Sequence, residues 1–357
     1  MDQTDKISVS QLFLLLLLSH SFSLACRSPM GEGGRMTLFA ILLSGLMQAA
    51  VLLAGLYFCR RKTGLSPFSA QGGGFYRVQN LLYWGCCMTA TVCTMVDFIS
   101  FMTTVVYDDR EGWLVAVTFG LAGALAACQG LEGMARGGGI LAVLLGLGCV
   151  IIALGLWREY DWRNLSAGIL PLGDTLGGAC YDAAQNCELF ALLLLLPHLR
   201  KAPRSISCAG WVGCLTLAAV ALRLMTVLTL GSYGGMKPFP VFTAMTSLGF
   251  RSFHRLDSVL LIIWVMLGLA RLAVFLSLSA KQSAGIFFRP WGKGWVWGNA
   301  ALSAAGALAL WTGPESWGAH FYRWPVTGAV TLLGVLLLPM AGWLLDRRGE
   351  EGGKEKG

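Results

Sequence analysis

Charged residues are scarce in this sequence. Asp, Glu, Lys and Arg make up only 13% of its 357 residues, whereas 55% of the residues are hydrophobic and the mean hydropathy is +0.64. Soluble globular domains carry about 25% charged residues. The composition therefore excludes a separate soluble domain away from the chain ends, and it predicts an integral membrane protein.

Motifs for catalysis and for metal or nucleotide binding are also missing. The four histidines and eleven cysteines show no metal-ligand spacing. Most cysteines lie in apolar runs, where a thiol is a small hydrophobic group, so no disulfide framework is expected, although Cys180 and Cys187 lie close together in the sequence. The three glycines at residues 137–139 follow no strand and predict no phosphate-binding loop. We expect no enzyme, no catalytic residue, no metal and no cofactor.

Long apolar runs are plentiful, and a membrane-spanning helix needs about 20 such residues. We expect ten spans, at about residues 11–26, 36–58, 81–106, 113–128, 140–157, 169–198, 209–230, 256–278, 295–311 and 326–345. Residues 1–346 would form a single polytopic membrane domain. Residues 347–357 are charged and Gly-rich, and they predict a disordered cytoplasmic tail.

Basic residues define the expected orientation. With the N-terminus inside, the basic clusters at residues 60–62 and 200–204 face the cytoplasm and the acidic loop at residues 108–111 faces outward, as the positive-inside rule requires. The net charge of +8 comes from such loops and indicates no nucleic-acid partner. A cleaved signal peptide ending near Arg27 is the alternative reading of the first apolar run, and it would leave nine spans.

The sixth span carries polar residues at membrane depth. Asp182, Asn186 and Glu188 interrupt an apolar run that then continues cleanly to Pro197. Acidic groups inside a membrane are costly and usually mark a functional site. We predict two half-helices joined by an unwound turn at about residues 183–187. The alternative is one intact helix whose polar residues face its neighbours.

The first span is interrupted as well, by polar residues 19–23, and it precedes the sixth by five spans. Interrupted spans at corresponding positions of two halves are the best sequence indication of an inverted-repeat transporter site. No repeat is visible at the level of individual residues. The pattern nevertheless predicts an inverted repeat of five plus five helices, with the first and sixth helices broken.

Several short stretches, in their order and spacing, resemble one protein family. They are Lys6-Ile7-Ser8, Gln11-Leu12-Phe13, Glu188 nine residues before Pro197, Pro240-Val241-Phe242, Arg255-Leu256-Asp257 with Trp264, and Arg271. Together they are similar to the B subunits of bacterial spore germinant receptors, the spore germination permease family. Two positions depart from the family, which commonly has glycine at the first-span break and before the sixth-span glutamate. This chain has Ser19-His20-Ser21 and Cys187 there.

The resemblance implies the amino acid–polyamine–organocation superfamily and a LeuT-like fold. It also implies a multi-pass protein of the spore inner membrane that senses a nutrient beside A and C subunits. We expect a small amino-acid-like germinant as ligand and a relay of its binding to those partners. The alternative function is a proton-coupled permease for amino acids or similar solutes.

The predicted breaks define a candidate ligand site. Unpaired amides at the start of a half-helix attract anions, and the N-in topology places such amides near Phe22, where they suit a ligand carboxylate. Carbonyls at the end of the first half of the sixth span suit a ligand ammonium. The expected ligand-binding residues are Ser19, His20, Ser21, Phe22, Tyr181, Asp182, Asn186 and Glu188.

Each charged candidate has alternative roles. Glu188 opens the second half-helix, whose positive end favours a carboxylate, and it either caps and packs that helix or binds a cationic group. His20 either titrates near neutral pH or is a hydrogen-bonded core residue. Asp97 and Arg223 either pair or reach polar surroundings separately. Arg271 either takes the place of the cation that sodium-coupled relatives hold between the first and eighth spans, or snorkels to the inner surface.

Overall fold

The computed structural model describes residues 6–26, 38–61, 74–106, 112–157, 159–166, 172–246, 256–287, 289–313 and 324–344. The acidic loop expected at residues 108–111 and the tail expected at residues 347–357 lie outside these ranges. The described chain is helical apart from turns and one isolated backbone bridge between Ile7 and Leu199. An all-α membrane fold is thereby confirmed.

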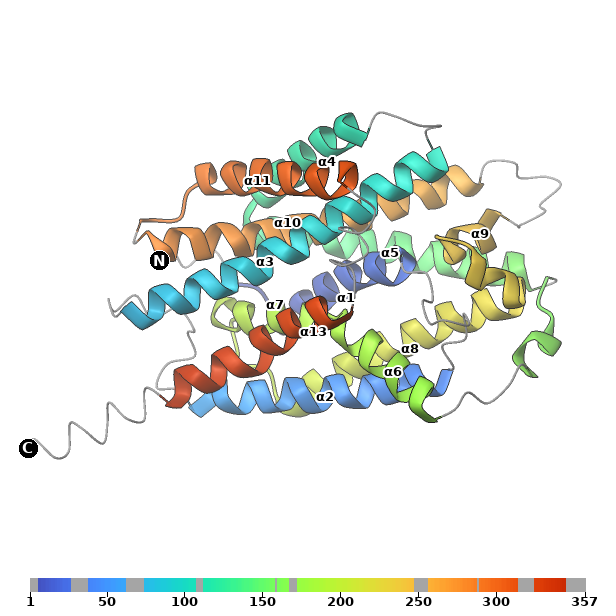
Figure 1. Ribbon diagram of the computed structural model, residues 1–357, viewed down its shortest axis with the longest axis horizontal. Coiled ribbons are helices and arrows are strands. Elements are labelled where there is room, and N and C mark those ends of the chain that lie inside the picture. The colour runs from blue at the N-terminus through green and yellow to red at the C-terminus, as the bar shows by residue number, and fades with distance from the viewer. Residues whose placement is uncertain are drawn as a thin grey trace, which may run out of the picture.

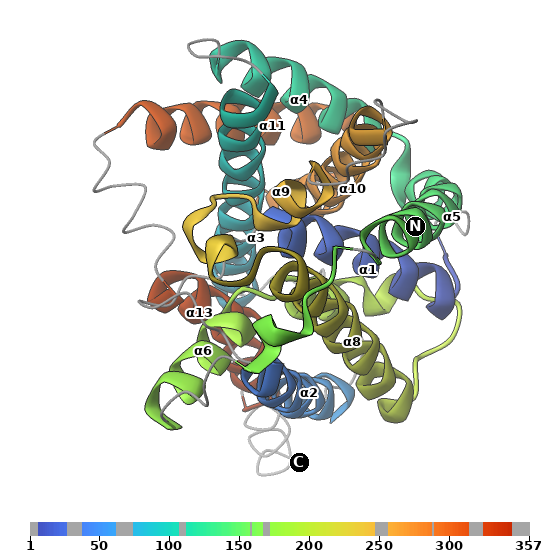
Figure 2. The ribbon, with the colours of Figure 1, turned by 90° about the vertical axis from the view of Figure 1, so that its right-hand side faces the viewer.

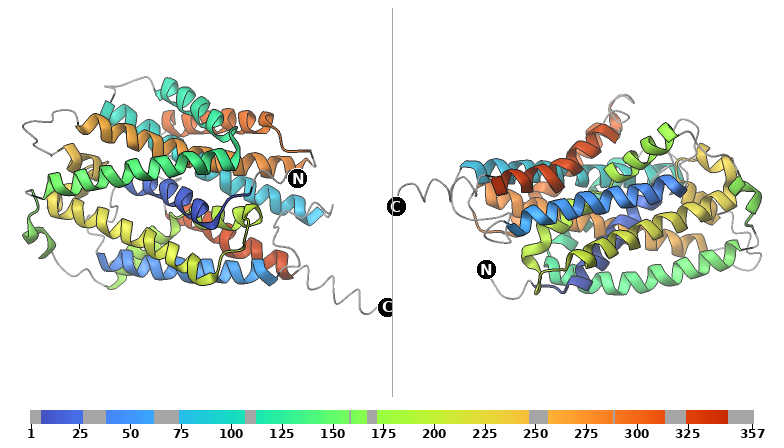
Figure 3. Two further views of the ribbon diagram at one scale, coloured as in Figure 1. Left: turned by 180° about the vertical axis from the view of Figure 1, so that it is seen from behind. Right: turned by 90° about the horizontal axis from the view of Figure 1, so that it is seen from below.

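The helices run roughly along one common direction (Figures 1 and 3). The α-helices are α1 (Val9–Cys26), α2 (Leu38–Arg61), α3 (Gly74–Phe101), α4 (Gly112–Ala127), α5 (Gly130–Leu156), α6 (Leu172–Ala184), α7 (Glu188–Leu195), α8 (Ser205–Leu230), α9 (Pro240–Thr246), α10 (Leu256–Ile286), α11 (Lys293–Thr312) and α13 (Trp324–Leu332). Shorter turns are the π-helical η2 (Met102–Val106) and η6 (Leu333–Leu337) and the 3-10 helices η3 (Trp162–Ser166), η4 (Leu196–His198) and η5 (Gly231–Met236).

Each of the ten expected spans coincides with a helix or a helix pair. Within the described ranges, 8 helices are long and apolar enough to cross a membrane. They do not include α4, a shorter apolar helix of 16 residues, or α11, which has 20 residues. The structure therefore confirms a multi-pass protein, while the count of ten crossings stays a prediction.

The first span is a continuous helix, so the interruption expected at residues 19–23 is wrong. The hydroxyl of Ser21 donates to the carbonyl of Leu17, 2.8 Å away and one turn earlier. A serine that satisfies itself on its own helix does not break that helix. At the N-terminal end, Ser8 and Gln11 form a capping box, with Gln11 N to Ser8 Oγ at 3.2 Å and Ser8 N to Gln11 Oε1 at 3.0 Å.

The sixth span is broken, as predicted. Helix α6 ends at Ala184 and α7 begins at Glu188. Irregular backbone at membrane depth must be satisfied by surrounding protein, and Thr331 on α13 donates to the carbonyl of Ala184 at 2.8 Å. All eight residues of α7 are buried. The break therefore lies in the protein interior, with α2 and α13 packed against α6 (Figure 2).

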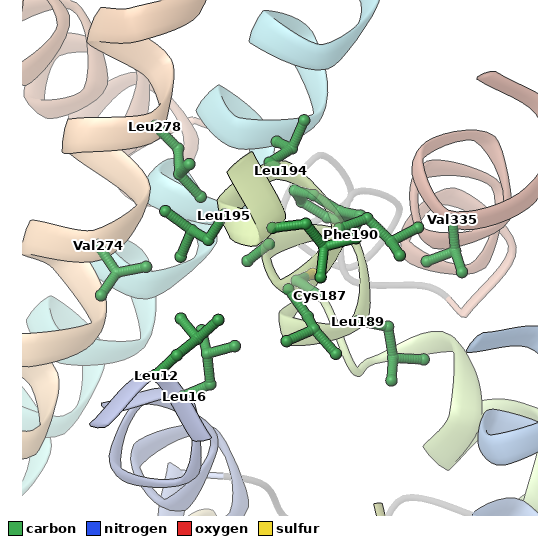
Figure 4. Close-up of a cluster of buried hydrophobic side chains, with 14 of the residues drawn as sticks. Leu12, Leu16, Cys187, Leu189, Phe190, Leu194, Leu195, Val274, Leu278 and Val335 are labelled. Atoms are coloured by element: carbon green, nitrogen blue, oxygen red, sulfur yellow. The ribbon is translucent and has the colours of Figure 1, made fainter. Parts of the chain in front are cut away.

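Helix α1 lies inside the bundle, packed against α5, α8 and α10 (Figure 2). The half-helix α7 is surrounded by leucines of α1 and by apolar residues of α10 and η6 (Figure 4). Among the contacts in this core are Leu12 and Leu16 from α1, Val274 and Leu278 from α10, and Val335 from η6. This apolar core fixes α7 against the helices that carry the candidate site residues.

The N-terminal end of α1 is joined to the segment that follows α7. The amide of Ile7 donates to the carbonyl of His198 at 3.1 Å, and the amide of Arg200 donates to the carbonyl of Ile7 at 3.0 Å. The side chain of Arg200 also donates to the carbonyl of Lys6 at 3.0 Å. We call these contacts the Ile7–Leu199 clasp.

Candidate functional site

A buried acid at the break connects three helices. Glu188, the first residue of α7, is 0% exposed. Ser19 Oγ on α1 donates to Glu188 Oε1 at 2.8 Å, and His20 Nδ1 lies 3.2 Å from Glu188 Oε2. Arg271 on α10 forms an ion pair with Glu188 Oε1. We call Ser19, His20, Glu188 and Arg271 the Glu188 cluster.

Arg271 is fixed in the interior rather than at the surface. Arg271 is 4% exposed, and its Nε donates to Thr94 Oγ1 on α3 at 3.0 Å. Its Nη1 also donates to the carbonyl of Ser19 at 3.3 Å, and the guanidinium lies 5.2 Å from the ring centre of Phe275. Arginine stays charged when buried and offers five donors. The alternative in which Arg271 snorkels to the inner surface is therefore wrong.

The placement of Glu188 follows from its position in the sequence. The N-terminus of α7 carries a partial positive charge from the helix dipole, which favours a carboxylate. A charge buried with both an ion-pair partner and hydrogen-bond donors avoids much of the penalty that an isolated charge would have. Both oxygens of the carboxylate are engaged by side chains of α1 and α10, and the choice between a cap-and-packing role and a ligand-binding role for Glu188 stays a prediction.

A second polar cluster lies on the α2 side of the same break. Ser44 Oγ donates to Asp182 Oδ2 at 2.7 Å, and Gln48 Nε2 lies 2.9 Å from Ser44 Oγ and 3.5 Å from Asp182 Oδ2. Asn186 Nδ2 donates to Gln48 Oε1 at 2.6 Å. We call Ser44, Gln48, Asp182 and Asn186 the α2 cluster. Gln48 thereby contacts both α6 and the turn that follows it.

The predicted site residues thus separate into two groups. Ser19, His20 and Glu188 converge with Arg271, whereas Asp182 and Asn186 face α2. Tyr181 is half-buried on α6, next to Asp182 in sequence.

Ser21 and Phe22 lie elsewhere on α1. Phe22 is fully buried against Trp264, with 4.8 Å between ring centres, and a Cβ added at Gly268 would lie 2.8 Å from its ring. Because α1 is continuous, the amide of Phe22 lies within a helix. The reason for expecting a carboxylate site there does not apply. A ligand role for Ser21 and Phe22 stays a prediction.

Ser44, Gln48 and Thr94 contact the predicted site residues or Arg271, although the sequence alone does not single them out. Ser44 and Gln48 are four residues apart in an apolar span, a spacing that places two side chains on one helix face. That spacing is a usable signal for a polar stripe, although it names no partner. Thr94 gave no signal, because buried threonines commonly bond to their own helix, as Thr94 also does to Ala90 at 2.7 Å. The pairing of Asp97 with Arg223 remains untested.

The eleven cysteines are all free thiols, Cys180 and Cys187 included. Within the described ranges, no group of three or more His, Cys, Asp or Glu side chains could hold a metal ion. The chemistry that the break offers is therefore that of hydrogen bonding and charge: a buried ion pair with a histidine beside it on one side, and a carboxylate with two amides on the other.

The chain is an all-helical membrane bundle whose sixth span breaks at a buried acid that bonds to the first and eighth spans, and comparison with a solved structure shows that its fold is LeuT-like. A crystal structure of MhsT in complex with L-phenylalanine is similar, with a TM-score of 0.62 over 96% of this chain and 98% of that chain. The sequence identity is 15%, so this likeness shows the fold alone.

The family follows from sequence. A family model described as "Spore germination protein", the spore permeases, matches residues 35–289, which is more than half of the chain. The chain belongs to the spore germination permease family. A sequence search of curated proteins found no significant match.

Proposed function

We propose that this chain is the nutrient-sensing subunit of a germinant receptor in the spore inner membrane. It binds a small amino-acid-like ligand at the break of the sixth span and relays that binding to A and C partner subunits. The observation that carries the proposal is the Glu188 cluster, in which one buried carboxylate joins α7 to α1 and α10. A ligand that shifts the break by a small distance changes the packing of three helices at once.

The Ile7–Leu199 clasp supports sensing rather than transport. Helix α1 and the sixth span are bonded at mid-membrane through Ser19 and Glu188, and again at the inner end through Ile7 and Arg200. Opening the inner side by moving α1 away from α7 would break both sets of bonds. A receptor only has to shift this unit, whereas a transporter has to open it on every cycle.

A proton-coupled amino acid permease is the second candidate. The observation that favours it is the contact between His20 Nδ1 and Glu188 Oε2, two buried titratable groups 3.2 Å apart. Histidine is the side chain most suited to exchange a proton near neutral pH. In this alternative His20 would take up and release the coupled proton.

Arg271 fits the role of a built-in cation in either case. Its guanidinium lies between α1 and α10, bonded to the Ser19 carbonyl and to Glu188. The first and eighth spans are the pair that holds an ion in sodium-coupled proteins of this fold. A permanent positive charge at this place removes the need for a bound sodium ion, so ligand recognition should be independent of sodium.

The test is a deletion of this gene in its own spore former, complemented with variants. Spores are scored for dipicolinic acid release against the concentration of each nutrient, and protein amounts are measured by immunoblot. The deletion should abolish the response to at least one amino acid. Asn186→Phe and Ser21→Phe should shift the dose–response while the protein still accumulates, and Glu188→Gln should lower the amount of protein.

The control is Arg136→Gln on α5, whose side chain is 73% exposed in a surface pair with Glu132. It should behave as wild type. If the deletion leaves every nutrient response unchanged, the sensing role is wrong. If a proton gradient instead drives the accumulation of labelled amino acid in liposomes that contain the purified protein, the permease alternative replaces the sensing role.

A further inference from the structure

The α2 cluster contains a polar atom whose hydrogen-bonding capacity is unused. Ser44 and Asn186 are each 0% exposed and Gln48 is 5% exposed. The Oδ1 atom of Asn186 is buried and has no hydrogen-bond partner. Buried polar atoms without a partner are rare and costly in proteins, and each one requires an explanation. Asn186 lies in the break itself, between α6 and α7.

The neighbours of Asn186 fix the orientation of its amide, so that the atom without a partner is the acceptor oxygen and not the donor nitrogen. The Gln48 nitrogen lies 2.9 Å from Ser44 Oγ and 3.5 Å from the Asp182 carboxylate. Its oxygen therefore points the other way and accepts from Asn186 Nδ2 at 2.6 Å. Turning both amides round would place the Gln48 oxygen against the carboxylate, where two acceptors repel. Asp182 thus fixes both amides and leaves Asn186 Oδ1 available.

An occupant of this position has to be a hydrogen-bond donor, and the nearby carboxylate of Asp182 favours one with positive charge. A primary ammonium group offers three donors and a full charge. Hydrogen bonds between a charged donor and neutral or anionic oxygens are about twice as strong as neutral ones. In the Glu188 cluster, by contrast, both oxygens of the Glu188 carboxylate are already engaged, by Ser19, His20 and Arg271. Of the two clusters at the break, the α2 cluster has the unused acceptor.

We propose that the α2 cluster binds the ammonium group of the ligand. Asn186 Oδ1 and the Asp182 carboxylate accept its hydrogen bonds, and Gln48 and Ser44 on α2 hold those two acceptors in place. The inference rests on the proposed function and deepens it in two respects. It adds Ser44 and Gln48 as specificity determinants, and it makes the amine the recognised end of the ligand.

The test uses the purified full-length protein in detergent and three probes: an equimolar mixture of the common L-amino acids, the same mixture N-acetylated, and NaCl or KCl alone. The readout is the apparent melting temperature. The free amino acids should stabilise the wild type, and the N-acetylated mixture should not, because acetylation removes the ammonium. This comparison needs no variant and so does not depend on how variants fold.

Two variants then locate the effect. Gln48→Leu and Ser44→Ala should each weaken the apparent affinity for the amino acid mixture by about tenfold, because each removes a hydrogen bond that positions Asn186 or Asp182 as an acceptor for the ammonium. Matched controls are Gln282→Leu and Ser303→Ala, the same changes at residues that are 0% exposed on α10 and α11. The controls should leave that affinity within about twofold of wild type.

The outcomes separate the two proposals. If the amino acid mixture does not stabilise the wild type, the amino-acid ligand of the proposed function is wrong. If the mixture binds but the N-acetylated mixture binds equally, or if Gln48→Leu matches Gln282→Leu, the ammonium site is wrong while the proposed function stands. Stabilisation by NaCl or KCl alone that Gln48→Leu abolishes would make the cluster an inorganic cation site and would also overturn the inference.

Discussion

The ion pair of the Glu188 cluster should be strongly coupled, and a double-mutant cycle can measure that coupling. Glu188→Gln and Arg271→Gln each remove one charge and leave the other at a site that is 0% or 4% exposed. Removing one partner of a buried ion pair costs about 3–5 kcal/mol, because an uncompensated charge stays behind. The double variant Glu188→Gln/Arg271→Gln leaves no buried charge, and Ser19 and Thr94 can still bond to the amides.

The loss of stability in the double variant should therefore be smaller than the sum of the two single losses by about 2–3 kcal/mol. The surface pair Arg136–Glu132, with side chains 73% and 33% exposed, is the matched control. Exposed pairs contribute about 0–1 kcal/mol, so Arg136→Gln and Glu132→Gln should have small and additive effects.

The assay is the apparent melting temperature of the purified chain in detergent, followed by fluorescence-detected size exclusion after heating. The unfolding entropy grows with chain length, so a loss of 1 kcal/mol lowers the melting temperature of a chain of 357 residues by only about 1.3 °C. Each single variant should then melt at least about 4 °C below wild type, with the double variant above the additive expectation. If the single variants match the α5 controls, or if the cycle is additive, the pair does not stabilise the break.

Three further outcomes are expected. Replacing NaCl by KCl at constant ionic strength should leave the nutrient dose–response of spores unchanged, because Arg271 supplies the fixed charge between α1 and α10; a sodium requirement would contradict this. Ser8→Ala should destabilise the chain by about 1 kcal/mol through loss of the capping box, with Ser207→Ala, at an exposed serine in the first turn of α8, as the control, and equal melting temperatures for the two would show that the cap is unimportant. A reporter fused to the C-terminus should read as cytoplasmic and the mature protein should contain α1, whereas a mature chain beginning near Cys26 or Arg27 would mean a cleaved leader and nine spans.

Several features of this protein follow from the sequence by itself. The scarcity of charge and the length of the apolar runs required a multi-pass helical membrane protein, because burying charge in a bilayer is costly. The polar residues around Asn186 predicted the break of the sixth span, since an apolar run of that length does not otherwise change character at membrane depth. The position of Glu188 at the start of the second half-helix followed from the same pattern.

The tertiary structure alone decided whether α1 is broken and which side chains meet at the sixth-span break. The sequence does not distinguish a serine that bonds within its own helix from one that lies at a helix break. Only the folded chain shows that the Ser21 hydroxyl donates to the carbonyl of Leu17. Glu188 lies 169 residues from Ser19 and 83 from Arg271 along the chain. Periodicity names the face of a helix but not the helix that packs on it, so contacts over such separations depend on how the helices pack together.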